Sequence, residues 1–221
     1  MTLYKFTDES GRTHNGEFQW SLPVQNTDGS WTPGNWAPPI VGRLHVCKRA
    51  YHAAKNEQIL SWLRPRMFEI EFRARHYTKR WPNGDKVYGR QARLIREVTA
   101  WNNRTARLFA VWCARQALES ITTPYWKSVA ACNVAERYAN GQATDFELAI
   151  ARADAISVPW RGQQYSQWAA GSTTLCSASA AARDAAYNLT QMAPSMAARN
   201  KARDVQYRQL MQMLGEKIDI G

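Results

Sequence analysis

The spacing of apolar residues along the chain changes character near residue 98. Before that point, short alternating runs of apolar and polar residues are separated by turn-forming clusters, for example at 26–30 and 32–35. This pattern is typical of short β-strands. We predict strands at 3–6, 17–21, 35–37, 43–47, 67–76 and 86–96, and one helix within 50–63, where Ile59, Leu60 and Leu63 form a short apolar stripe.

After residue 98 the apolar residues recur with helical spacing. Asn102 or Asn103 is suited to cap a helix that continues to about Ser120. A second helix is expected at about 127–140, ending at Gly141. The capping-box spacing of Thr144 and Glu147 then opens a third helix that ends before Pro159, and Ala-rich helical segments follow at 163–193 and 195–214.

These patterns predict an α+β protein with two domains. We expect residues 1–98 to form a small Trp-rich β layer with one helix and a protruding basic β-hairpin at 73–96. Residues 99–221 are expected to form a C-terminal helical bundle. In its first helix, small residues share one face and allow another helix to approach closely; they are Ala106, Ala110, Cys113 and Ala117.

The charge of the chain is unevenly distributed. The formal net charge is +11, and residues 43–115 contain 17 Lys and Arg against 5 Asp and Glu, a net charge of +12. The remainder contains 12 Lys and Arg against 13 Asp and Glu, a net charge of −1. A surface with such an excess of positive charge favours polyanionic partners.

The predicted hairpin combines this charge with aromatic residues. Asn83-Gly84 between two strand-like runs is a strong signal for a two-residue turn. That turn would place Trp81 opposite Lys86, Lys79 opposite Tyr88 and Tyr77 opposite Arg90, all on one side of the ribbon. The expected contact residues are Arg73, Arg75, Tyr77, Lys79, Trp81, Lys86, Tyr88 and Arg90.

Three roles of this hairpin remain open at this point. Cations that follow phosphates, with rings on which bases stack, are used to bind single strands, and a two-stranded ribbon also fits the major groove of a duplex. The same surface could bind an acidic protein. Cation–aromatic pairs also stabilise a hairpin without any ligand.

Two other clusters are weaker candidates for chemistry. Glu69 and Glu71 project from the same face of a strand, and one of them could act in acid–base catalysis if its pKa were raised. His45, Cys47 and His52 are metal-ligand types within reach of one another, but a closed site needs four ligands. We expect no metal and no cofactor, and we expect Cys113, Cys132 and Cys176 to pack on helices as small apolar residues.

The first 120 residues or so resemble an uncharacterised family of proteins encoded by bacteriophages and prophages. The resemblance is carried by Tyr4-Lys5-Phe6-Thr7-Asp8, Leu44-His45-Val46-Cys47, Trp62-Leu63 with Phe68-Glu69-Ile70-Glu71, and the segment 101–118. The family has no known activity, so the resemblance implies an origin rather than a reaction. A fainter likeness to degenerate ADP-ribosyltransferase folds would make Glu69 and Glu71 the catalytic pair.

We therefore expect a phage-encoded accessory protein that binds nucleic acid or a nucleoprotein through its hairpin without catalysis. An inhibitor of a host defence or regulatory protein is the main alternative, and an enzyme that uses Glu69 and Glu71 is the second. The first residues contain no signal-peptide pattern, and no apolar run is long enough to span a membrane. These features predict a cytoplasmic location in the host cell and no membrane partner.

Overall fold

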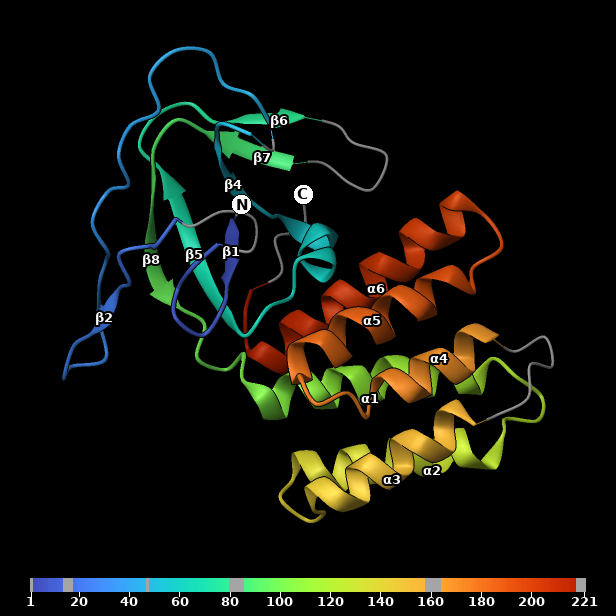
Figure 1. Ribbon diagram of the computed structural model, residues 1–221. Coiled ribbons are helices and arrows are strands. Elements are labelled where there is room, and N and C mark those ends of the chain that lie inside the picture. Colours follow the sequence, from blue (N-terminus) through green and yellow to red (C-terminus); the bar gives the residue numbers. More distant parts are fainter. Residues whose placement is uncertain (1, 14–17, 47, 80–85, 158–163, 218–221) are drawn as a thin grey trace. The chain divides into compact units, whose positions relative to one another are not determined.

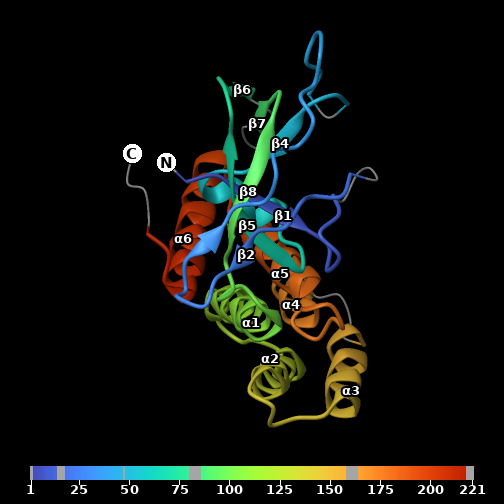
Figure 2. The ribbon, with the colours of Figure 1, turned by 90° about the vertical axis from the view of Figure 1, so that its left-hand side faces the viewer.

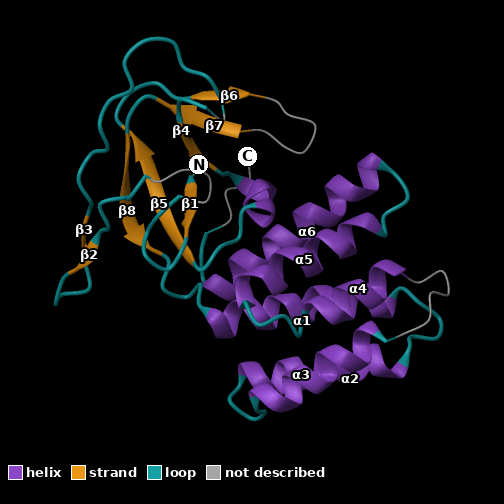
Figure 3. Cartoon of the chain, viewed as in Figure 1, coloured by secondary structure: helices purple, strands orange, loops and turns teal. Residues whose placement is uncertain are grey.

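The computed structural model describes residues 2–13, 18–46, 48–79, 86–157 and 164–217. The chain is an α+β protein that divides into two compact units, Met1–Thr99 and Ala100–Ile218 (Figure 1). Every strand of the described residues belongs to the first unit, and its one helical element is a short 3-10 helix, η1 (Asn56–Ser61) (Figure 3). The second unit consists of α-helices.

Two small antiparallel sheets form the first unit. The first has the strand order β1-β5-β8, from β1 (Tyr4–Thr7), β5 (Arg66–Phe72) and β8 (Ala92–Glu97). The second has the order β4-β7-β6, from β4 (Tyr51–Ala53), β7 (Lys86–Gly89) and β6 (Tyr77–Lys79). A short hairpin joins β2 (Val24–Gln25) to β3 (Trp31–Thr32).

Apolar residues at alternate strand positions form the core of this unit. Phe68 and Ile70 of β5 pack with Leu94 of β8, and Val87 of β7 belongs to the same cluster. On the other face of β5 from Phe68 and Ile70, the acidic residues of this strand form ion pairs with arginines of β8. A register shift between Glu69 and Ile70 marks a β-bulge in this pair of strands.

The two predicted long strands are each interrupted. Residues 67–76 form β5 and then leave the ladder before β6, and residues 86–96 form β7 and β8 with a break at residues 90 and 91. Gly89, the last residue of β7, packs closely against Phe72, because a Cβ there would lie 2.5 Å from Cδ1 of Phe72. The prediction of two continuous strands was therefore wrong, because β7 joins one sheet and β8 the other.

Other predicted elements of the first unit differ in type. The segment predicted as a helix at 50–63 contains β4 followed by η1. Segment 43–47 forms only an isolated bridge between His45 and Arg49 within its described residues, and 17–21 only one between Gln19 and Arg12. Segment 35–37 is no assigned strand, although Ala37 N donates to Ala92 O at 2.9 Å along β8.

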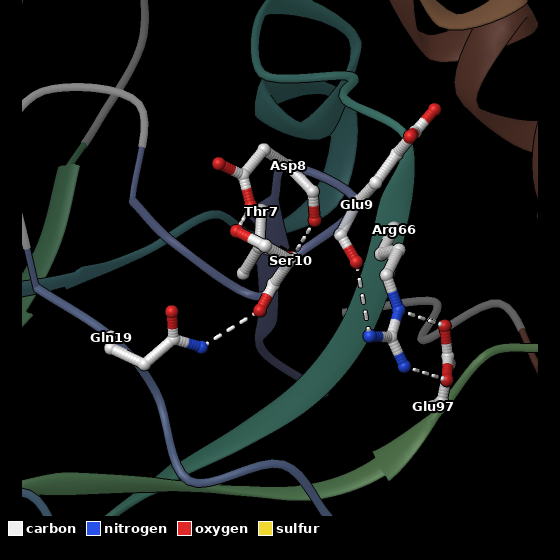
Figure 4. A network of polar contacts seen from close by, with 7 residues as sticks. All are labelled: Thr7, Asp8, Glu9, Ser10, Gln19, Arg66 and Glu97. Carbon is white, nitrogen blue, oxygen red and sulfur yellow. Dashed lines mark hydrogen bonds and ion pairs between the residues drawn. The ribbon is translucent and has the colours of Figure 1, made fainter.

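Polar contacts tie the loop after β1 to β5 and β8 (Figure 4). The guanidinium group of Arg66 donates two hydrogen bonds to the carboxylate of Glu97, at 2.7 and 2.6 Å, and a third to the carbonyl of Glu9 at 3.4 Å. Gln19 Nε2 donates to the carbonyl of Ser10 at 2.8 Å. These bonds hold the loop after β1 in one position relative to β5.

The first three helices of the second unit begin where the sequence predicts. Asn102 caps α1 (Asn103–Glu119) by accepting from Thr105 N, and Thr144 forms the predicted capping box of α3 (Asp145–Ile156). Gly141, with a φ of 71°, follows α2 (Trp126–Ala139). The remaining helices are α4 (Gln164–Ser172), α5 (Ala178–Gln191) and α6 (Met196–Leu214).

The segment predicted as 163–193 is two helices rather than one, since residues 173–177 connect α4 to α5. The buried guanidinium of Arg107, on α1, donates to the carbonyls of Thr173 at 2.6 Å and Cys176 at 3.2 Å in that connection. It thereby supplies hydrogen-bond donors to two carbonyls of the segment that connects α4 to α5.

Helix α1 packs against α2, α4 and α5 (Figure 2). Ala106, Ala110, Cys113 and Ala117 are all buried. No helix in the described ranges is both long and apolar enough to cross a membrane.

Candidate nucleic-acid interface

The predicted hairpin is present in a different register. Tyr77 lies opposite Tyr88 and Lys79 opposite Lys86, so the predicted pairs of Tyr77 with Arg90 and of Lys79 with Tyr88 were wrong by two residues. A shift of two residues leaves the same side chains on the same face, and the apolar pattern therefore cannot distinguish the two registers. Trp81, the 83–84 turn and the side chain of Lys79 lie outside the described part of the chain.

The observed register places aromatic residues together instead of alternating them with cations. The rings of Tyr77 and Tyr88 lie 5.6 Å apart with an interplanar angle of 31°. On the other side of β7, His52 of β4 is opposite Tyr88, and their ring centroids are 6.5 Å apart at 34°. Tyr77, Tyr88 and His52 therefore form one row across three strands, here called the aromatic row.

The aromatic row occupies the outer face of the β4-β7-β6 sheet. Directly paired residues project from the same side of a sheet, and successive residues from opposite sides. Val87 and Ala53, next in sequence to Tyr88 and His52, are buried in the core. The row consequently lies on the face of the sheet opposite Val87 and Ala53, where Tyr77 is 40% exposed and Tyr88 and His52 are half-buried.

Cations lie beside this row. The guanidinium carbon of Arg75 is 5.6 Å from the centroid of the Tyr77 ring. Lys86 is two residues before Tyr88 on β7, and its ammonium lies 5.2 Å from the centroid of the Trp62 ring. The face thus combines aromatic rings with positive charge, although the pairing differs from the predicted one.

A pocket adjoins the row at β4. It has a volume of about 400 Å³, which is within the usual size of small-molecule sites. His52 and Lys86 take part in both the pocket and the face that carries the row. The other lining residues include rings and cations, among them Phe18, Trp20, Tyr51, Trp62, Lys5, Lys48, Arg49 and Arg64, and the described lining residues include no carboxylate.

Lys5 is the most unusual residue of this pocket. Its register partner on β5 is Phe68, which is fully buried, so the lysine projects from the inward side of the sheet. Burial lowers the pKa of Lys5 to about 8. Its ammonium lies 5.6 Å from the centroid of the Trp20 ring, and no ion pair to a described carboxylate accompanies that contact.

His52 is held in its neutral form. Burial lowers the pKa of His52 to about 4, and the positive charges of Lys5 and Lys86 contribute to the shift. Near pH 7 the imidazole is therefore uncharged and presents a flat ring with one donor and one acceptor. This environment favours an anion or an aromatic ring over a cation.

The apolar wall of the pocket is a cluster of three rings. Trp20 makes edge-to-face contacts with Phe18 at 5.1 Å and with Tyr51 at 5.5 Å. Trp20 is 3% exposed, and its Nε1 has no hydrogen-bond partner among the described residues. Tyr51 donates its hydroxyl proton to the carbonyl of Pro38 at 2.9 Å, which fixes this side of the pocket.

Two predicted contact residues have other roles in the structure. The guanidinium of Arg90 donates to the carbonyls of Ile40, at 3.0 Å, and Gly42, and so holds the loop that contains them. Arg73 lies over the Trp36 ring at 5.9 Å, on the same ring that Arg93 contacts at 4.5 Å. Among the described residues, neither side chain forms a hydrogen bond, ion pair or ring contact with the aromatic row.

The two candidate catalytic carboxylates lie in cross-strand ion pairs. Glu69 accepts from Arg96 at 2.9 Å, and Glu71 accepts from Nε of Arg93. Neither carboxylate lines the pocket described above. His45 is exposed in a separate loop, so the structure does not bring it together with Glu69 and Glu71 in one cleft.

The candidate metal ligands are not assembled either. Among the described residues, no three His, Cys, Asp or Glu side chains are placed to hold a metal ion, and Cys47 is outside those residues. Cys113 and Cys132 are buried as predicted, and burial raises the pKa of Cys132 to about 12. Cys176 departs from the prediction, because it is exposed between α4 and α5.

The residues that sequence reasoning missed are those that build the pocket. Lys5 lies between Tyr4 and Phe6, and a charged residue within such an apolar strand could have drawn attention. Its inward direction depends on the pairing of β1 with β5, and the paired residues are more than sixty positions apart in the sequence.

Comparison of the chain with protein-family models, with curated proteins and with solved structures finds no match.

Proposed function

We propose that this chain binds single-stranded nucleic acid, without catalysing a reaction, on the outer face of its β4-β7-β6 sheet. The observation that carries the proposal is the aromatic row itself: three rings on adjacent strands, 5.6 and 6.5 Å apart, with Arg75 and Lys86 beside them. Sheet faces with this composition bind unpaired bases by stacking and the backbone by charge.

A single strand fits this face better than a duplex does. The base pairs of a duplex are stacked on one another, so their flat faces are not free to contact side chains. Tyr77 is 40% exposed and can contact an unpaired base directly. The cations supply the part of the affinity that does not depend on sequence.

Fluorescence anisotropy with labelled oligonucleotides of about 12 nucleotides tests the proposal. Wild-type protein should bind single-stranded DNA or RNA more tightly than a duplex of the same sequence. The affinity should fall as salt rises from about 50 to 200 mM, because binding displaces condensed counterions. Equal or tighter binding to the duplex contradicts the proposal, as does no binding at low salt.

Substitutions on and off the row make the test specific. Tyr77→Ala should weaken binding about tenfold, because it removes a stacking surface, whereas Tyr77→Phe retains the ring and should bind nearly as the wild type does. Tyr187→Ala, at an exposed tyrosine of α5 in the second unit, is the matched control and should have no effect. If Tyr77→Ala also binds normally, the row is not the interface.

The alternative of a protein partner gives a different result. An acidic protein would bind this face through Arg75 and Lys86, and its capture would survive nuclease treatment. Oligonucleotide binding would then be absent or unaffected by Tyr77→Ala.

A further inference from the structure

We infer that the pocket beside β1 and β4 is a second binding site, for a phosphate group attached to an aromatic base, as in a nucleoside 5′-monophosphate. This inference goes beyond the proposed function, because it rests on the pocket and not on the aromatic row. It does not require that a strand bind to the outer face of the sheet.

The first argument is the balance of charge. Lys5, Lys48, Arg49, Arg64 and Lys86 line the pocket, and none of its described lining residues is acidic. Positive charges gathered in a partly enclosed space attract an anion. A phosphate carries up to two negative charges and accepts several hydrogen bonds, so it fits this set of donors.

The second argument is the position of Lys5. A lysine on the inward side of a strand, opposite the buried Phe68, costs folding free energy when no carboxylate pairs with it. The inward position is useful when a charged ligand enters from the pocket, because a partly desolvated ammonium binds an anion more strongly than an exposed one does.

The third argument is the shape and chemistry of the remaining wall. Phe18, Trp20, Tyr51 and Trp62 supply flat apolar surface, and the indole N–H of Trp20 is buried with no acceptor among the described residues. A pocket of about 400 Å³ accommodates a ligand of nucleotide size. Inorganic phosphate alone would not contact this apolar wall.

Isothermal titration calorimetry of the full chain tests this site. The probes are the four ribonucleoside 5′-monophosphates, the corresponding nucleosides and inorganic phosphate. A monophosphate should bind at least about tenfold more tightly than either its nucleoside or inorganic phosphate, because it engages both the cations and the rings. If inorganic phosphate binds as tightly as every nucleotide, or if nothing binds at millimolar concentration, the inference is wrong.

Two pairs of substitutions locate the binding. Lys5→Met should weaken nucleotide binding at least about tenfold, whereas Lys201→Met, on an exposed lysine of α6, removes the same charge and should leave it unchanged. Trp62→Ala should weaken binding about tenfold, whereas Trp126→Ala, at a more exposed tryptophan of α2, should not. If the two substitutions of a pair weaken nucleotide binding equally, the nucleotide does not bind in the pocket. Circular dichroism and thermal unfolding verify that each variant is folded.

The phosphate could belong to a free nucleotide or to the end of a strand. Competition with short oligonucleotides that carry a 5′-phosphate or a 5′-hydroxyl distinguishes these sources, and displacement by the phosphorylated strand alone identifies the strand end. A free nucleotide is the source if neither strand competes. Because Tyr77→Ala changes the aromatic row and not the pocket, failure of this inference is separable from failure of the proposed function.

Discussion

The ammonium group of Lys5 lies 5.6 Å from the centroid of the Trp20 ring, on the inward side of β1. The position is set by strand pairing, because Lys5 is in register with the buried Phe68. Apolar surroundings disfavour the charged form of a lysine, and burial accordingly lowers the pKa of Lys5 to about 8. The buried charge of Lys5 therefore costs folding free energy.

Replacing this lysine should stabilise the free protein. Lys5→Met keeps the length of the side chain and removes the charge, so we expect the free energy of unfolding of the first unit to rise by about 1 kcal/mol near neutral pH. Urea unfolding of the ligand-free protein measures this, with Lys201→Met as the control that should change little. A lower free energy of unfolding for Lys5→Met would show that the buried charge of Lys5 does not destabilise the fold.

The stability difference should also depend on alkaline pH. The pKa of Lys5 is about 8 in the folded chain and 10.5 is the ordinary value, so between these two values the unfolded chain binds more protons. The wild type should consequently gain stability as the pH rises through this range, and its deficit relative to Lys5→Met should shrink. The substitution leaves the other charged and titratable groups of the pocket in place; they are Lys48, Arg49, Arg64, Lys86 and the neutral His52.

Urea unfolding curves of the wild type and of Lys5→Met at several pH values measure the difference in their free energies of unfolding. A constant difference across this range would mean that Lys5 titrates normally in the folded chain.

The lowered pKa of His52 should make the stability of the chain depend on pH in the acidic range as well. Its pKa is lowered to about 4 from an ordinary 6.5, so the unfolded chain takes up a proton first as the pH falls. The stability that the neutral ring provides is complete above pH 6.5 and is lost progressively towards pH 4. His52→Gln should lose less stability over this range than the wild type, and His45→Gln, at an exposed histidine, should behave like the wild type. Identical acid profiles for all three proteins would contradict the shift.

Gly89, at the end of β7, packs closely against the ring of Phe72. A Cβ at this position would lie 2.5 Å from Cδ1 and 2.9 Å from Cε1 of Phe72, so Gly89→Ala should destabilise the chain by about 1–3 kcal/mol. In contrast, Gly171→Ala on α4 meets no atom closer than 3.8 Å and should stabilise it by about 0.5–1 kcal/mol. Thermal unfolding compares the two variants, and Phe72→Leu should partly rescue Gly89→Ala. Equal stability of both alanine variants would disprove the role of this contact.

The sequence predicted the helical unit better than the β unit because helix signals are local. The caps at Asn102 and Thr144 and the glycine at 141 lie within a few residues of the helix ends that they determine. The connection between α4 and α5 was missed, because the Ala-rich run continues through it and its carbonyls are satisfied by Arg107 from another helix. That partner is more than sixty residues distant in sequence.

The candidate site was predicted in its composition but not in its arrangement. Tyr77, Tyr88 and Lys86 do share one face of a ribbon, yet the Tyr77–Tyr88 and His52–Tyr88 contacts follow from pairings that the apolar pattern leaves undetermined. His52 joined the row only because residues 51–53 form a strand instead of the predicted helix. The pocket required the pairing of β1 with β5, which no local pattern indicates.

Photo-crosslinking of a single-stranded oligonucleotide that contains 5-iodouracil tests the central claim most directly. The crosslinked peptides are identified by mass spectrometry, so the measurement reports where the bases contact the protein. Binding on the aromatic row predicts crosslinks to Tyr77, Tyr88 or His52, and their loss when unlabelled single strand is added in excess. Crosslinks confined to the helical unit, or none at these three residues despite measurable binding, would contradict the proposed interface.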